Sequence, residues 1–243
     1  MRIGKALDNF LFTTCIHILL SSTNLAVAQN KSIIYEYTVT KNAKVDIKNK
    51  NSNLPFTAAQ VDKINRVINE TKEIFKLSVI KDKSSYKFSE SRTPSDIKTQ
   101  GTISLIADYY KDHKLKKLFL TGGNNLMNKC VDESYKDLNN WELVDFDTII
   151  YNLPCKKAVE KSTKSIAYYT KLILVADGPE HFADLPGLIV LIKSFKKTIK
   201  LTNIIKEVNS NLLKLPNDCK NKISFWKYYD EHDASKDIGN FKK

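Results

Sequence analysis

The chain has 243 residues, of which 39 are lysine or arginine and 27 are aspartate or glutamate, so its formal net charge is +12. Only three of the basic residues are arginine and the lysines are spread along the whole chain, whereas proteins that read nucleic acids rely on clustered arginine with its bidentate fork. We therefore expect no nucleic-acid partner. The sequence also lacks the C-x-x-C and H-x-x-x-H spacings of zinc sites, so we expect no metal and no other cofactor.

Residues 1–28 have the pattern of a cleavable secretory signal. An apolar stretch from Phe10 to Leu20 follows two basic residues, and Ala26-Val27-Ala28 is the A-x-A pattern at which signal peptidase cuts. The apolar stretch is shorter than the roughly 20 residues that cross a bilayer, so a transmembrane anchor is the less favoured alternative. We expect an exported protein, periplasmic or secreted, that begins near Gln29 and is at most peripheral to a membrane.

The first segment after this signal predicts a strand followed by a helix. Apolar residues alternate from Ser32 to Thr40, which is the period of a half-buried strand. Further on, Thr57 and Gln60 have the spacing of a capping box, and apolar residues then recur at helical spacing. We therefore expect one long amphipathic helix from about Thr57 to Glu73.

β-favouring residues return after this helix, in short runs that are bounded by polar or Gly-containing turns. They predict an antiparallel meander whose strands contain Leu77–Val79, Tyr86–Phe88, Ile103–Leu105, Leu118–Leu120, Trp141–Phe146, Ile166–Leu174, Leu188–Ile192 and Thr198–Leu201. From Ile204 onward the apolar residues fit a helix better than a strand. We expect one domain over residues 29–220, of β-dominated α+β class with a curved, mainly antiparallel sheet, and a lysine-rich, aromatic tail over residues 221–243.

Three cysteines remain after the signal, namely Cys130, Cys155 and Cys219. In an oxidising compartment an odd number predicts one disulfide and one free thiol, or a bond to another chain. We expect a disulfide between two of the three. Cys130 and Cys155 are the preferred pair, because the strands that follow them could lie side by side in the meander.

Residues 178–192 (GPEHFADLPGLIVLI) form the most informative segment. Gly178-Pro179 and Pro186-Gly187 are both turn dipeptides, in which the second proline presets φ and the following glycine accepts the positive φ of a type II turn. The apolar run Leu188–Ile192 lacks alternation, as expected for a strand buried on both faces. We expect a compact loop whose final turn sets the register of this strand.

The segment resembles the signature of the GLPGLI family, a group of exported proteins of Bacteroidetes-type bacteria. Three further motifs agree in the same order: Trp141 with Leu143 resembles the family's W-x-L, Cys155–Ala158 its C-K-K-A, and Ala167–Thr170 its A-W-Y-T. The resemblance covers roughly residues 70–205. It implies export and a shared fold, but no particular activity, because the family is functionally uncharacterised.

Some positions depart from the family pattern. Asp184 stands where the family usually has glycine, Tyr168 where it usually has tryptophan, and Asn152-Leu153-Pro154 replaces its usual Gly-Tyr approach to the cysteine. If the family's glycine has a positive φ, Asp184 must adopt that conformation at a modest cost.

Three roles compete for the GPEHF loop. His181 with Asp177, Glu180 and Asp184 nearby has the residue types of general acid-base chemistry, but the sequence has no G-x-S-x-G nucleophile, so we expect no enzyme and no catalytic residue. A structural turn with an exposed histidine is the favoured role, and a binding loop at a pocket mouth is the alternative. That binding site would comprise Gly178, Pro179, His181, Phe182, Leu185, Pro186 and Gly187.

Asp230–Asp233 offers four possible metal ligands in succession. On an extended segment, consecutive side chains point in opposite directions. We therefore interpret these residues as a solvated acidic patch and expect no metal site there.

The expected fold is similar, by analogy only, to the half-barrel of lipoprotein carriers, in which a curved sheet wraps a helix and leaves an apolar cavity. We therefore expect non-enzymatic binding of a hydrophobic or peptide ligand in the cell envelope. A structural or protein-interaction component of the envelope is the alternative. The partners would accordingly be a lipid, a peptide or another envelope protein.

Overall fold

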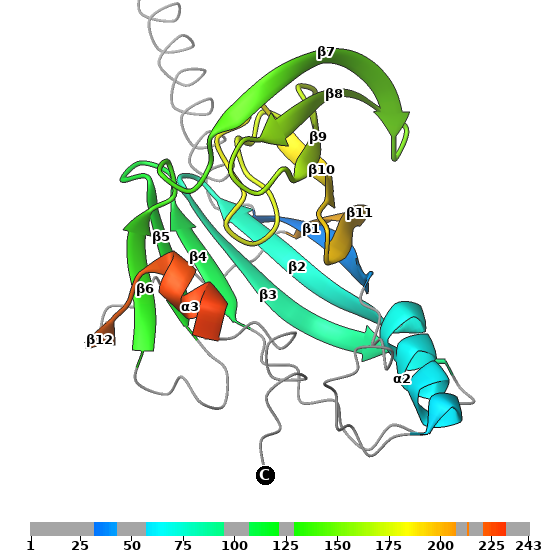
Figure 1. Cartoon of the computed structure of the whole chain (residues 1–243). Coiled ribbons are helices and arrows are strands. Elements are labelled where there is room, and N and C mark those ends of the chain that lie inside the picture. The colour runs from blue at the N-terminus through cyan, green and yellow to red at the C-terminus, as the bar shows by residue number, and fades with distance from the viewer. Residues whose placement is uncertain are drawn as a thin grey trace, which may run out of the picture.

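The structure is a computed structural model that describes residues 32–42, 57–94, 107–121, 129–207, 213 and 221–231. These residues form one twelve-stranded sheet with the strand order β12-β6-β5-β4-β3-β2-β1-β11-β10-β9-β8-β7, and the sheet is strongly curved (Figure 1). Neighbouring strands are antiparallel except β12, which runs parallel to β6. In the described part of the chain, no helix is long and apolar enough to cross a membrane. The expected signal over residues 1–28 lies outside the described residues.

The large antiparallel sheet confirms the β-dominated class that the sequence predicts. The elements have the following bounds in chain order: β1 Ser32–Lys41, α2 Ala58–Glu70, β2 Lys72–Ile80, β3 Lys83–Arg92, β4 Asp108–Asp112, β5 Lys117–Thr121, β6 Lys129–Ser134, β7 Trp141–Ile150, β8 Leu153–Glu160, β9 Ile166–Thr170, β10 Leu188–Lys193, β11 Lys197–Glu207, β12 Asn221–Lys222 and α3 Phe225–Glu231. The expected strand around Ile103–Leu105 lies outside the described residues.

The first strand, β1, lies near the middle of the sheet. It pairs with β2 on one side and with β11 on the other, so that Tyr37 faces Phe75 and Leu201. The alternate residues Tyr35, Tyr37 and Val39 are buried, which confirms the half-buried strand predicted from alternation. Because β11 returns beside β1, strands β2 to β6 extend to one side of this pair and β10 to β7 to the other.

The helix α2 is shorter than the sequence suggests. Its capping box is present as predicted, because the Thr57 side chain accepts from the Gln60 backbone and the Gln60 side chain accepts from the Thr57 backbone. The expected long amphipathic helix is nevertheless wrong, since α2 ends at Glu70 and Val61 is its one buried residue. The last residue of the expected helix, Glu73, belongs to β2 instead. There its backbone finds hydrogen-bond partners in the ladders with β1 and β3.

The C-terminal helix expected from Ile204 is also wrong over the part that the structure describes. Strand β11 continues through Glu207, and Ile204 and Ile205 pair with Tyr35 and Ile34 of β1. Since β1 offers ladder partners along its whole length, the strand continues where local spacing favoured a helix. Residues 208–212 and 214–220 lie outside the described residues.

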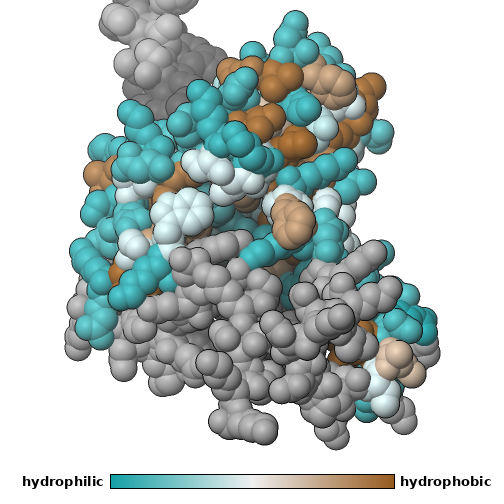
Figure 2. Space-filling view, in the orientation of Figure 1, coloured by the Kyte–Doolittle hydropathy of each residue, from teal (hydrophilic) through white to brown (hydrophobic). Residues whose placement is uncertain are grey.

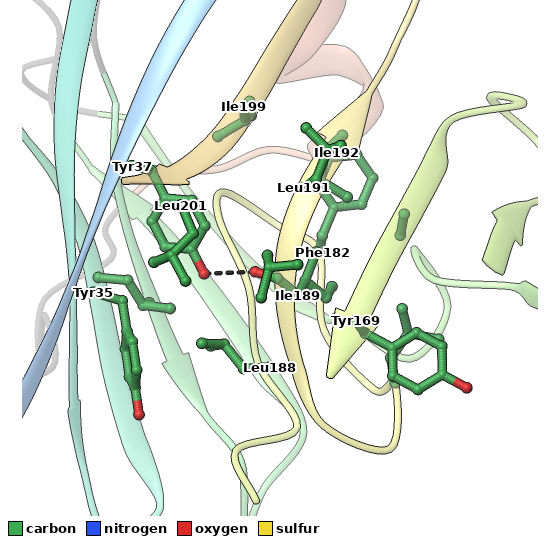
Figure 3. Packing of buried hydrophobic residues seen from close by; sticks show 14 of the residues in the cluster. Tyr35, Tyr37, Tyr169, Phe182, Leu188, Ile189, Leu191, Ile192, Ile199 and Leu201 are labelled. Carbon is green, nitrogen blue, oxygen red and sulfur yellow. Dashed lines mark hydrogen bonds between the residues drawn. The ribbon is translucent and has the colours of Figure 1, made fainter. Parts of the chain in front are cut away.

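The main core lies on the face of the sheet that carries Tyr35, Tyr37 and Ile199, which we name the inner face. Apolar side chains from the central strands meet there with Phe182 and Leu185, which belong to the connection between β9 and β10 (Figure 3). All five residues of Leu188–Ile192 are buried, as their unbroken apolar run predicts. The connection thus packs as part of the core.

A second core cluster joins the other half of the sheet to the C-terminal segment. Leu118, Leu120 and Val131 of β5 and β6 pack with Phe225 and Tyr228 of α3. Both β12 and α3 belong to residues 221–243, which we expected to form a lysine-rich, aromatic tail. This segment therefore begins as part of the same sheet and core.

Candidate functional site

The segment over residues 171–187, which connects β9 to β10, is named the signature loop here. Residues 177–183 of this loop are buried, and Asp177 and Ala183 form an isolated antiparallel bridge within it. The Ile189 amide donates to the Asp177 carbonyl at 2.9 Å. From the centre of the sheet, the Tyr37 hydroxyl donates to the Ile189 carbonyl at 2.6 Å (Figure 3). The loop therefore folds back onto the inner face.

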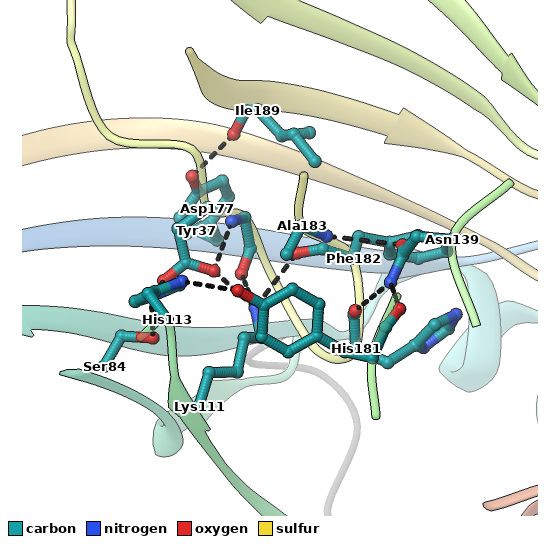
Figure 4. Close-up of polar contacts among 12 residues, drawn as sticks. Tyr37, Ser84, Lys111, His113, Asn139, Asp177, His181, Phe182, Ala183 and Ile189 are labelled. Atoms are coloured by element: carbon teal, nitrogen blue, oxygen red, sulfur yellow. Dashed lines mark hydrogen bonds and ion pairs between the residues drawn. The ribbon is translucent and has the colours of Figure 1, made fainter. Parts of the chain in front are cut away.

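A fully buried ion pair anchors the signature loop to β4. Nζ of Lys111 lies 2.5 Å from Oδ1 of Asp177 and also donates to the carbonyls of Gly178 at 2.7 Å and Phe182 at 3.0 Å (Figure 4). Burial lowers the pKa of Lys111. Burial alone would raise the pKa of Asp177, but the charge of Lys111 and the contact with His113 hold that pKa well below its ordinary range. Asp177 is therefore ionised at pH 7, and its carboxylate lies against the Lys111 amine as a buried ion pair.

Ser84, His113 and Asp177 meet in a group with the composition of a nucleophilic triad. Nε2 of His113 is 3.1 Å from the Ser84 hydroxyl and 3.2 Å from Oδ2 of Asp177, whereas Nδ1 is 3.2 Å from the Tyr135 hydroxyl. In a working triad the acid binds one ring nitrogen and the serine the other. Here serine and acid share Nε2, and Ser84 is fully buried. The geometry does not fit a serine nucleophile.

Two side chains near the start of β7 hold the middle of the signature loop. Nδ2 of Asn139 donates to the carbonyls of His181 at 2.9 Å and Tyr135 at 2.7 Å, and its Oδ1 accepts from the Ala183 amide at 3.3 Å. Nε1 of Trp141 donates to the Ala183 carbonyl at 2.8 Å. Side chains about 40 residues away in the chain thus provide hydrogen-bond partners for the backbone of the loop.

His181 is buried, so its expected exposure is wrong. It is 6% exposed, and its ring centroid lies 4.0 Å from that of Phe182 and 4.6 Å from that of Phe225 in α3. Burial, aided by the positive charges of Lys197 and Lys111, lowers the pKa of His181 to about 3. Its Nε2 has no hydrogen-bond partner among the described residues. A neutral ring packed against two phenyl rings is poorly placed for acid-base chemistry.

The three carboxylates that surround His181 in sequence contact three different lysines. Asp177 binds Lys111, as described above, Glu180 binds Lys197, and Asp184 binds Lys116 at 2.5 Å. Asp184 has a φ of 67°, so this residue tolerates the left-handed conformation that glycine adopts most readily. The carboxylates and His181 therefore do not form the acid-base group that the sequence suggested.

Gly187 is required by a close backbone approach. Its φ is +152°, and a Cβ atom added there would lie 2.0 Å from the carbonyl oxygen of Thr170 in β9. The type II turn that we expected has a φ near +80° at this position, so the expected turn type is wrong although the need for glycine stands. The neighbouring Leu188 pairs with Thr170, and the glycine thereby permits the register of β10.

The predicted binding residues form a packed unit. Six of them are buried and Pro186 is exposed; the buried ones are Gly178, Pro179, His181, Phe182, Leu185 and Gly187. The sequence grouped these seven residues correctly as one loop. It missed Lys111 of β4, Trp141 of β7 and Asn139 just before β7, which hold the loop from other parts of the chain.

Cys155 is a free, buried thiol that donates to the Leu153 carbonyl at 3.2 Å. The preferred disulfide between Cys130 and Cys155 is therefore wrong in this structure. Its strands, β6 and β8, are not neighbours, because eight other strands of the sheet lie between them. Cys219 lies outside the described residues, but Lys222, three residues later, pairs with Cys130.

The described residues contain no group of three or more histidine, cysteine, aspartate or glutamate side chains that could hold a metal ion. The side chains of Asp230–Asp233, where the sequence suggested a solvated acidic patch, lie outside the described residues.

Fold and site together define a β-sheet protein whose large central loop is fixed from within by buried polar contacts. No family model matches the chain, and no curated protein matches it. Two solved structures of PNGF-II, in space groups C2 and P21, are similar to it at 14% sequence identity, with TM-scores of 0.49 and 0.51. The alignments cover 84% and 82% of this chain but 33% and 32% of the PNGF-II chains, so the chain spans about a third of their length. At this identity the likeness concerns the fold alone.

Proposed function

We propose that this chain is an exported, non-enzymatic protein of the cell envelope, a member of the GLPGLI family, that binds another protein through an exposed apolar surface. One contrast carries the proposal. The buried ionisable side chains of the signature loop, Asp177, Glu180 and His181, are engaged in structural contacts, whereas large apolar side chains are exposed at one end of strands β7 to β9.

The state of the signature loop supports a role without catalysis. A general acid or base needs an accessible proton and a substrate within hydrogen-bond reach. Asp177 and Lys111 are 0% and 1% exposed and bind each other, and His181 is neutral and packed against phenyl rings. These groups stabilise the fold and leave little reactive surface.

The exposed apolar surface lies at the turn between β7 and β8 and just after β9. Ile149 and Tyr151 are 74% and 39% exposed, and Leu172 and Leu174 are 66% and 92% exposed. The antiparallel pairing of β7, β8 and β9 brings these chain positions to the same end of the strands. We name this group the apolar end. Hydrophobic surface gathers over the region where Figure 1 draws β7 and β8 (Figure 2).

An edge strand adds to this surface. β7 is the last strand of the sheet and pairs with β8 alone among the described strands, and its Leu143 and Phe146 are 59% and 47% exposed. Apolar side chains that are exposed together, in contrast to single scattered ones, mark interaction sites. Binding to a partner would remove this surface from water.

The experiment compares two matched double variants in the producing cell. Ile149→Ser with Leu174→Ser alters the apolar end, whereas Leu115→Ser with Phe195→Ser alters two apolar residues elsewhere that are 62% and 94% exposed. After mild cross-linking, native mass spectrometry of the purified protein should find a protein partner with the wild type and the second variant but not with the first. A partner that both variants retain, or no partner at all, would contradict the proposal.

Binding of a hydrophobic or peptide ligand, as in a lipoprotein-carrier half-barrel, is the second candidate. It is favoured by the buried Tyr86 hydroxyl, which lacks a hydrogen-bond partner among the described residues and lies in a row of aromatic rings with Phe75, Tyr37 and Tyr109. Buried hydroxyl groups are nearly always hydrogen-bonded, so this one favours a bound molecule that accepts or donates a hydrogen bond there. Native mass spectra with a small bound molecule, retained in both double variants, would select this candidate.

A further inference from the structure

Two hairpin turns lie next to each other at the end of the sheet opposite the apolar end. The turn between β8 and β9 contains Lys161 and Lys164, and the turn between β10 and β11 contains Phe195 and Lys196. Pairing of β9 with β10, in which Ile166 faces Lys193, places the two turns side by side. The inference drawn from this arrangement concerns a different surface from the proposed function and does not depend on it.

Phe195 is held away from the protein at the tip of its turn. Its side chain is 94% exposed. The turn is closed by Ser194, whose amide and hydroxyl donate to the Lys197 carbonyl at 2.9 Å and 3.0 Å. The Lys196 carbonyl also accepts from the Asn42 amide at 2.7 Å. A phenyl ring is thus presented to solvent on a turn that is fixed at both sides.

The lysines around Phe195 leave positive charge at this end. Lys161, Lys164 and Lys193 are exposed, and no ion pair joins any of the three to a carboxylate of the described residues. We name these three lysines with Phe195 the basic rim.

The carboxylates nearest the basic rim are largely engaged elsewhere. Glu160 is buried and accepts from the Thr163 amide and hydroxyl, while Glu180 binds Lys197. Among the carboxylates of the described residues near this end, Glu142 on β7 is exposed and forms no ion pair. The basic rim therefore has a net positive charge.

We propose that the basic rim docks on an anionic lipid bilayer, with Phe195 in the interfacial layer and the lysines against the lipid phosphates. Lysine gains from the negative surface potential, by roughly five-fold in partitioning for each lysine near the surface, and an exposed aromatic ring is favoured at the membrane interface. A nucleic acid is the less favoured polyanion, because the rim contains no arginine for bidentate phosphate contacts. Docking at this end leaves the apolar end directed away from the membrane.

The test measures co-sedimentation of the full chain, in the form that its own cell produces, with lipid vesicles. One set of vesicles is phosphatidylcholine alone, and the other is an equal mixture of phosphatidylcholine and phosphatidylglycerol. Binding is expected with the mixed vesicles only, and it should weaken as salt is raised, because the lysines are exposed to screening.

Two double variants that each remove one lysine charge and one exposed apolar side chain locate the site. Lys164→Ser with Phe195→Ser should reduce binding by more than about ten-fold, whereas Lys114→Ser with Leu115→Ser, in the exposed turn between β4 and β5, should leave it unchanged. Unfolding curves establish that both variants are folded.

Several results would overturn the proposal. They are no binding to the anionic vesicles, an equal loss in both variants, and a preference for a single-stranded oligonucleotide that depends on the same residues. The variant with Ile149→Ser and Leu174→Ser is expected to keep its vesicle binding. Failure of the membrane proposal and failure of the proposed protein interaction can therefore be distinguished.

Discussion

Replacing Lys111 with methionine should be among the most damaging single changes in this protein. The substitution keeps most of the apolar stem but removes the ammonium group, which lies 2.5 Å from Asp177 and donates to the carbonyls of Gly178 and Phe182. Breaking a buried ion pair by removing one partner costs about 3–5 kcal/mol, because the remaining charge stays buried without compensation. His113 still contacts Asp177, so we expect a value toward the lower end.

Lys116→Met is the matched control. Lys116 also binds the signature loop, through Asp184 and at the same 2.5 Å, but its side chain is 46% exposed. An exposed pair of this kind contributes about 0–1 kcal/mol, because water already solvates both charges.

Urea unfolding at pH 7, followed by tyrosine and tryptophan fluorescence, gives the free energy of unfolding of both variants. Similar losses for Lys111→Met and Lys116→Met, or a loss below about 1 kcal/mol for Lys111→Met, would refute the role of burial. Adding Asp177→Leu to Lys111→Met should recover part of the loss, because no unpaired charge then remains in the core.

Three further predictions follow from the signature loop and its surroundings. Gly187→Ala should lower the free energy of unfolding by about 2–4 kcal/mol, because its Cβ would lie 2.0 Å from the Thr170 carbonyl oxygen; the exposed Pro186→Ala is the control, and equal urea midpoints would contradict the prediction. His181 has a pKa of about 3 in the folded protein and about 6.5 when unfolded. The unfolded chain therefore binds the proton first, and stability should fall by about 2 kcal/mol from pH 7 to pH 5; His181→Leu should remove most of this slope in urea titrations at the two pH values, and an unchanged slope would show that other groups cause it. Cys155 should react with a thiol reagent only after unfolding, since it is 2% exposed and burial raises its pKa; peptide mapping without reduction that finds Cys155 in a disulfide would refute this.

Local patterns of the sequence predicted much of the secondary structure. Alternation identified β1, the unbroken apolar run identified β10, and the spacing of Thr57 and Gln60 identified the start of α2. Asp184 has a positive φ, a conformation that the sequence raised only as a condition. Each of these features depends on backbone preferences and side-chain periodicity within a few residues, and a sequence records such short-range effects directly.

The residues at which helices and strands end are determined by pairing with segments far away in the chain. α2 ends at Glu70 and β11 extends to Glu207 because β1 supplies ladder hydrogen bonds to β2 and β11 from both sides. Helical spacing near Ile204 could not reveal this, since the pairing joins residues about 170 positions apart. Tertiary contacts of this kind override local propensity.

The candidate site was decided almost entirely by the tertiary structure. The sequence grouped the GPEHF loop with its turns correctly, yet it gave no sign that Lys111, one of many lysines, would reach Asp177 from β4, or that Asn139 and Trp141 would bind the loop backbone. It also placed His181 in solvent, because the cover that Phe225 provides comes from a helix more than 40 residues later. Composition and periodicity determine which segments are strands, whereas burial, and with it the charge and reactivity of each side chain, is set only when distant segments pack together.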